Sequence, residues 1–65
     1  MYDWYEVYEC PDGPTEKGRY IGATPMREQA EQAAARHNAE LWHGMAGSAW
    51  FVRGVRSDGT RVTFL

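Results

Sequence analysis

A single helical segment constrains the fold more than any other part of this sequence. Thr24-Pro25 predicts its start, because Thr caps free backbone N–H groups and Pro is tolerated at the first helical position. Gly44 predicts its end. Between them, small and apolar side chains recur on one helical stripe: Met26, Ala30, Ala33, Ala34, His37 and Leu41. This narrow stripe, rich in alanine, predicts a helix that packs closely on one face of a β-sheet.

The remaining segments are typical of strands and turns. Residues 2–9 and 19–22 favour strands, and residues 10–18 between them hold two prolines and two glycines, which predict a loop. Residues 49–56 and 61–65 flank Asp58-Gly59, a pair that favours a two-residue type I′ hairpin turn. The order predicts one α+β domain over residues 1–65. We expect a small two-layer ββαββ domain, with an antiparallel three- to four-stranded sheet and one helix packed on one face.

Composition narrows the class of protein. A hydrophobic content of 43%, with three Trp, four Tyr and two Phe, indicates a folded chain. The formal net charge of −2 provides no basic field of the kind that drives nucleic-acid binding. The single cysteine, Cys10, excludes an internal disulfide. We find no apolar run of the ~18 residues that a membrane span needs and no signal-peptide pattern, so we expect a cytoplasmic protein.

One helix covers one face of a sheet, which raises the question of the other face. If Asp58-Gly59 forms the centre of the turn, Val55 lies opposite Val62 and Arg53 lies opposite Phe64. Burying Arg53 beneath the helix would be costly. We therefore assign to the helix side Tyr5, Val7, Trp50, Val52 and Leu65. The face turned away from the helix, called the far face, is then expected to carry Trp4, Glu6, Tyr8, Phe51, Arg53, Val55, Val62 and Phe64.

The expected far face predicts a protein-binding site. It is rich in aromatic residues and holds one candidate charge pair, Glu6 with Arg53, as protein interfaces often do. Two alternatives remain open. In the first, the register is shifted by one residue and these residues form the core; in the second, loops of the same chain cover the far face. As an interface, it would bind a host protein or a second copy in a homodimer.

Three arginines near the last hairpin define an alternative function. Arg53, Arg56 and Arg61, with aromatic residues nearby, indicate a binder of single-stranded nucleic acid or of nucleoprotein. The acidic total charge opposes this function. We favour an internal ladder, in which acids of the first strand pair with these arginines; the acids are Asp3, Glu6 and Glu9.

No residue pattern indicates catalysis. Cys10, His37 and His43 lack both a third orienting group and the spacing of a metal site, and His37 is expected to be a partly buried core residue. Phosphate-loop and calcium-loop motifs are absent from the sequence. We therefore predict a non-catalytic protein without cofactor, metal or small-molecule substrate.

The segment Tyr20–Asn38, with its Thr-Pro start and alanine-rich helix, resembles a pattern found in small uncharacterised proteins of actinobacteria and their phages. The resemblance covers about a third of the chain and transfers no functional residue. It implies a phage-encoded accessory protein, acting in the host cytoplasm, that binds and alters a host protein.

Overall fold

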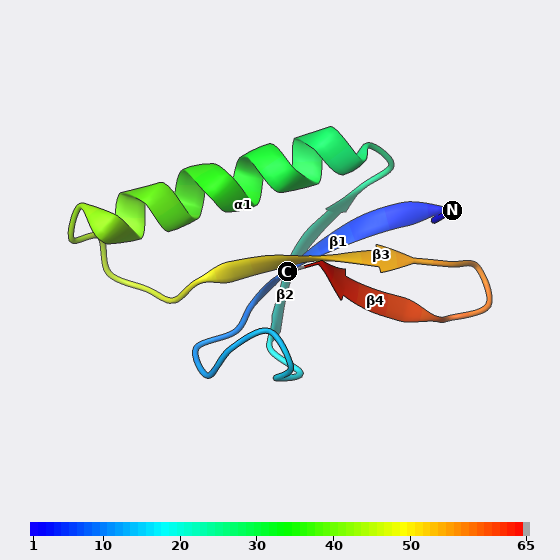
Figure 1. The fold of residues 1–65 in the computed structure, drawn as a ribbon, viewed down its shortest axis with the longest axis horizontal. Helices are drawn as coiled ribbons and strands as arrows, with labels where there is room; N and C mark the ends of the chain where they lie inside the picture. The colour runs from blue at the N-terminus through cyan, green and yellow to red at the C-terminus, as the bar shows by residue number, and fades with distance from the viewer. Residues whose placement is uncertain (65) are drawn as a thin grey trace.

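The computed structural model describes residues 1–64 and confirms the predicted ββαββ order (Figure 1). The elements are β1 (Trp4–Glu9), β2 (Arg19–Thr24), α1 (Arg27–Trp42), β3 (Trp50–Val55) and β4 (Arg61–Phe64). The strands form one antiparallel sheet in the order β2-β1-β3-β4, with α1 along one side of it. Within residues 1–64, no helix is long and apolar enough to cross a membrane.

The core lies between the two central strands and the helix. Val7 of β1 and Val52 of β3 are buried against Ala30 and Ala34 of α1. Each buried valine contributes roughly 1.5–3 kcal/mol. Side chains packed around this core are Tyr5, Ile21, Trp50 and Phe64. The predicted helix-side placement of Tyr5, Val7, Trp50 and Val52 is confirmed, while Leu65 lies outside the described residues.

The helix begins later than its sequence pattern predicts. β2 continues through Thr24, Met26 is the residue before the first turn, and α1 starts at Arg27. The hydroxyl of Thr24 accepts a hydrogen bond from the Met26 N–H at 3.2 Å. Thr24 therefore shapes the turn between strand and helix, and the prediction that it caps a helix starting at Pro25 was wrong.

The helix ends where predicted. Gly44 has a φ of +90°, a conformation that glycine adopts without steric cost. Its N–H donates to the Leu41 carbonyl at 3.1 Å, and the Met45 N–H donates to the Glu40 carbonyl at 3.2 Å. These two bonds form a Schellman motif, which satisfies carbonyls that the helix leaves free.

The β3–β4 hairpin differs from the predicted two-residue turn. The Arg56 N–H donates to the Thr60 carbonyl and the Gly59 N–H to the Arg56 carbonyl, both at 2.9 Å, so the loop spans three residues, 57–59. Gly59 has a φ of +92°, but Asp58 does not have a positive φ, which a type I′ turn requires. A three-residue loop that ends in a left-handed glycine corresponds to a G1 bulge.

The extra loop residue shifts β4 by one position against β3. Val55 pairs with Arg61, and Arg53 pairs with Thr63. Because side chains alternate along a strand, this shift turns Val62 and Phe64 toward the helix side. The prediction that these two residues belong to the far face was therefore wrong, and Arg61 and Thr63 take their places.

Gly54 is a point of close approach within this hairpin. A Cβ atom at Gly54 would lie 2.6 Å from the ring of Tyr2 and 2.8 Å from the ring of Phe64. These two rings meet edge to face, with centroids 5.4 Å apart.

Candidate protein-binding face

The far face is assembled from all four strands. Across β1 and β3, Trp4 lies opposite Val55, Glu6 opposite Arg53, and Tyr8 opposite Phe51. β2 adds Tyr20 beside Tyr8, and β4 adds Arg61 and Thr63. Six of the eight predicted residues therefore share this face, and the two exceptions are Val62 and Phe64.

Glu6 occupies the centre of the far face and is only 7% exposed. Its carboxylate accepts hydrogen bonds from Trp4 Nε1 at 3.0 Å, from the Tyr8 hydroxyl at 2.8 Å and from Arg61 Nε at 2.9 Å. Burial by itself raises the pKa of Glu6, but the hydrogen bonds from Arg61, Trp4 and Tyr8 outweigh it and lower the pKa to about 2. Glu6 is thus an ionised and fully bound group at neutral pH.

Arg53 is almost as buried, at 9% exposed, but it is bound by a different segment. Its guanidinium donates to the Lys17 carbonyl at 2.8 Å and, in a shorter contact, to the Glu16 carbonyl. It also donates to the Thr63 hydroxyl at 3.2 Å and lies 4.2 Å from the centre of the Tyr8 ring. Glu6 forms its ion pair with Arg61, so the expected pairing of Glu6 with Arg53 was wrong.

The loop over residues 10–18 therefore covers one end of the far face. Figure 1 shows this loop and α1 on opposite sides of the sheet. Coverage by a loop of the same chain was one of the alternatives raised from the sequence, and it holds at Arg53.

The rest of the far face presents partly exposed aromatic rings. Trp4, Tyr8 and Phe51 are half-buried, while Tyr20 is 55% exposed. Tyr8 and Tyr20 meet edge to face, with ring centroids 5.8 Å apart. Tyr20 was assigned to neither face from the sequence, and it lies opposite Tyr8 because a β-bulge at Ile21 changes the register between β1 and β2.

The hairpin arginines are all engaged within the chain. Arg53 is bound by loop carbonyls, Arg61 by Glu6, and Arg56 lies 4.7 Å from the centre of the Tyr2 ring. Among the described residues, the expected acid–arginine ladder is present as the pair of Glu6 with Arg61 alone. The other two acids bind elsewhere: Glu9 pairs with Arg19 at 2.9 Å, and Asp3 accepts the Ser57 N–H at 2.6 Å.

The thiol and imidazole groups lie on different sides of the sheet. Cys10, the first residue of the loop over residues 10–18, is buried beside Arg53, and burial raises the pKa of its thiol despite the nearby positive charge. His37 lies on the helix side, stacked on Trp50 with ring centroids 3.8 Å apart, so its expected partial burial is confirmed. His43 is exposed at the end of α1. Residues 1–64 hold no group of three or more His, Cys, Asp and Glu arranged to hold a metal ion.

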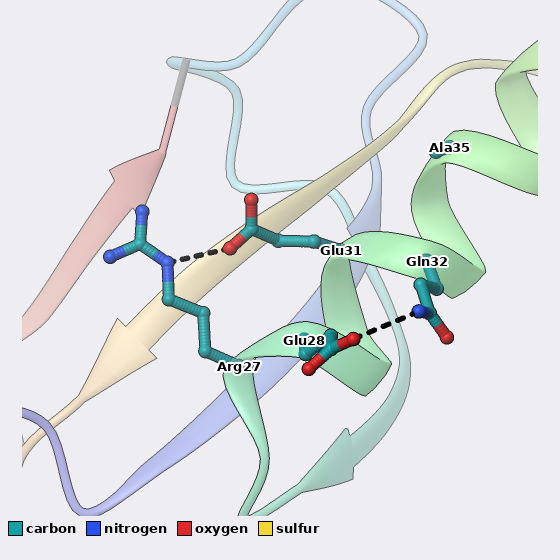
Figure 2. A pocket seen from close by; sticks show the side chains of 5 residues that line it. All are labelled: Arg27, Glu28, Glu31, Gln32 and Ala35. Carbon is teal, nitrogen blue, oxygen red and sulfur yellow. Dashed lines mark hydrogen bonds and ion pairs between the residues drawn. The ribbon is translucent and has the colours of Figure 1, made fainter.

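A shallow depression on the outer surface of α1 is lined by Arg27, Glu28, Glu31, Gln32 and Ala35. Figure 2 shows that its side chains bind one another in pairs one turn apart. Arg27 contacts Glu31 at 2.6 Å, and Gln32 donates to Glu28 at 3.3 Å. Exposed pairs at this spacing stabilise a helix by about 0.2–0.5 kcal/mol each. These side chains thus have a structural role in stabilising α1.

Comparison of the chain with protein-family models, with curated proteins and with solved structures gives no match. The geometry of the far face is therefore the basis for assigning a function.

Proposed function

We propose that this protein is a small non-catalytic protein-binding module that uses the far face. The observation that carries this proposal is a set of four aromatic side chains on the face that the helix leaves uncovered: Trp4, Tyr8, Tyr20 and Phe51. Tryptophan and tyrosine are enriched among the residues that dominate binding energy at protein interfaces.

The central charges of this face support a protein partner. Glu6 and Arg61 bind each other at 2.9 Å, and Glu6 also takes hydrogen bonds from two neighbouring aromatic residues. The carboxylate of Glu6 is already hydrogen-bonded within the chain. A partner can therefore cover the aromatic residues of the far face without leaving Glu6 unpaired.

The nucleic-acid alternative has less support. A phosphate group would compete with Glu6 for Arg61 and with the loop carbonyls for Arg53. The formal net charge of −2 also weakens association with a polyanion.

The resemblance of Tyr20–Asn38 to proteins of actinobacteria and their phages adds a source and a kind of partner. We propose a phage-encoded accessory protein that occupies the surface of a host protein in the host cytoplasm.

The test is a pull-down from an actinobacterial lysate, with and without nuclease, using the wild-type protein and three variants. Trp4→Ala and Phe51→Ala alter the far face, whereas Trp42→Ala removes an exposed ring, 90% accessible, at the end of α1. Circular dichroism and thermal unfolding verify that each variant folds.

We expect one nuclease-resistant host protein to be recovered by the wild type and by Trp42→Ala. Recovery should fall about tenfold or more with either far-face variant, as for residues that dominate an interface. Recovery that collapses with nuclease, or that depends on Trp42 and on neither Trp4 nor Phe51, would refute the proposal.

A further inference from the structure

β2 is an edge strand: within residues 1–64 it pairs with β1 on one side and with no strand on the other. The bulge at Ile21 is a feature of the kind that protects such edges, but other such features are missing from β2. It contains no proline, lysine or acidic residue, and its one charged residue, Arg19, is bound to Glu9 at 2.9 Å. An unprotected edge presents a row of backbone N–H and C=O groups, and the chemistry that satisfies such a row is another strand.

An apolar groove runs beside this edge on the helix side. α1 packs mainly over β3 and β1 and least over β2, which leaves a cavity of about 230 Å³ between α1 and β2. Ile21, Gly22, Ala30 and Ala33 line it, and its other lining residues are also uncharged. The groove would therefore accept an aliphatic side chain carried by a strand added to β2.

The order of side chains along β2 fits β2 of a second copy as that strand. Tyr20 lies opposite Tyr8 and Ala23 opposite Glu6, so both belong to the far face. Gly22 lies opposite Val7 on the helix side, and Ile21, the bulge residue, packs against the core on that side too. From Tyr20 to Ala23, the side chains therefore lie on the far face, the helix side, the helix side and the far face. This order is the same in both directions along the strand.

We propose that two copies pair through β2 in antiparallel orientation about a two-fold axis. Residues opposite each other must share a face, and the order along β2 meets this condition when Ile21 lies opposite Gly22 of the other copy. Tyr20 then lies opposite Ala23, so a large side chain meets a small one at both positions. Ile21 of each copy then lies beside Gly22 of the other at the edge of the groove, and the two Arg19 residues lie at opposite ends of the paired strands.

The dimer has a consequence for the far face. A two-fold axis perpendicular to the sheet keeps both helices on one side, so the two far faces join into one surface with Tyr20 of each copy at the seam. This inference needs no binding partner, because it concerns the protein alone, and its test is independent of the pull-down described above.

The test measures mass by light scattering during gel filtration over a range of concentrations. We expect the mass to rise from 7.4 kDa toward twice that value as concentration increases. Gly22→Lys should weaken association at least about tenfold, because it introduces a charge opposite Ile21 of the other copy. Gly22 has open space at its Cβ position, so the substitution leaves the monomer room to fold.

The matched control is Val62→Lys, which places the same charge on β4, the opposite edge strand, at a position 39% exposed. It should leave association unchanged. A second measurement needs no variant: a mixture of labelled and unlabelled wild-type protein should show NMR contacts between the Tyr20 ring of one copy and the Ala23 methyl group of the other. A monomer at every concentration, a dimer lost with Val62→Lys and kept with Gly22→Lys, or a dimer without the Tyr20–Ala23 contact would overturn the proposal.

Discussion

Glu6 and Arg53 lie opposite each other on β1 and β3, yet each is bound by a different segment of the chain. Glu6 is bound by Arg61 from β4, and Arg53 by carbonyls of the loop over residues 10–18. Glu6 thus holds β4 to the central strands, and Arg53 holds the loop over residues 10–18 to them.

The first prediction concerns stability in acid. Folding lowers the pKa of Glu6 from 4.5 to about 2, so the unfolded chain binds a proton more readily than the folded chain. The ionised group therefore stabilises the fold above pH 4.5, and this contribution is lost as the pH falls toward 2. Glu6→Gln should lower the free energy of unfolding at pH 7 by on the order of 2 kcal/mol, measured by urea denaturation.

The pH dependence separates Glu6 from the other acids. The difference between wild type and Glu6→Gln should shrink between pH 4.5 and pH 2. Glu31→Gln, which alters an exposed helix pair, is the matched control and should change stability by less than about 0.5 kcal/mol. A difference that stays constant down to pH 2 would contradict the assignment.

The second prediction concerns the access of reagents to Cys10. Arg53→Met removes the hydrogen bonds that hold the loop over the thiol, and a loss of about 1.4 kcal/mol would raise the open population about tenfold. Alkylation of Cys10 should accelerate accordingly. Loss of the positive charge alone would raise the pKa of the thiol and slow the reaction, so the direction of the change distinguishes loop opening from electrostatics. Arg56→Met, which alters a contact with Tyr2, should leave the rate unchanged.

The third prediction concerns the start of β3. The Asn38 side chain accepts from the Trp50 N–H at 2.8 Å and donates to the Trp50 carbonyl at 3.0 Å, in the manner of a neighbouring strand. Asn38→Ala leaves both backbone groups without this partner and should cost about 1–3 kcal/mol of unfolding free energy. Gln32→Ala, the loss of an exposed amide on the same helix, should stay within about 0.5 kcal/mol of wild type. Equal effects of the two substitutions would exclude a structural role for the Asn38 bonds.

The fourth prediction compares two strand glycines. Gly54→Ala places a methyl group against the rings of Tyr2 and Phe64 and should destabilise the fold by about 1–3 kcal/mol. Gly22→Ala meets nothing within 4 Å and should be neutral or slightly stabilising. Thermal unfolding of both variants, at a concentration where the wild type is monomeric, measures the contrast, and a stable Gly54→Ala protein would mean that the two rings move aside.

The elements of the fold were predictable because each has a local cause. The alanine stripe and Gly44 indicate the helix and its end, and aromatic and β-branched residues indicate the strands. The hairpin register was not predictable from Asp58-Gly59, because this pair occurs in both two-residue and three-residue loops. One extra residue moved Phe64 into the core and brought Arg61 to Glu6.

The contacts of the far face depend on features that leave no periodic trace in the sequence. Arg53 is bound by backbone carbonyls of a loop with two prolines, and a carbonyl is offered by every residue type alike. Tyr20 reaches the far face because the bulge at Ile21 changes the alternation along β2. The aromatic content of this face was visible from composition, but its coverage required the three-dimensional structure.

The strand order carries a consequence for synthesis on the ribosome. β1 lies between β2 and β3, and β3 comes only after the helix has been made. The emerging chain can form the hairpin of β1 and β2 early, but Val7 gains its cross-strand partner Val52 only when β3 has left the ribosome. Until then β1 is a second open edge of the first hairpin, which exposes the growing chain to chaperones and to other nascent copies.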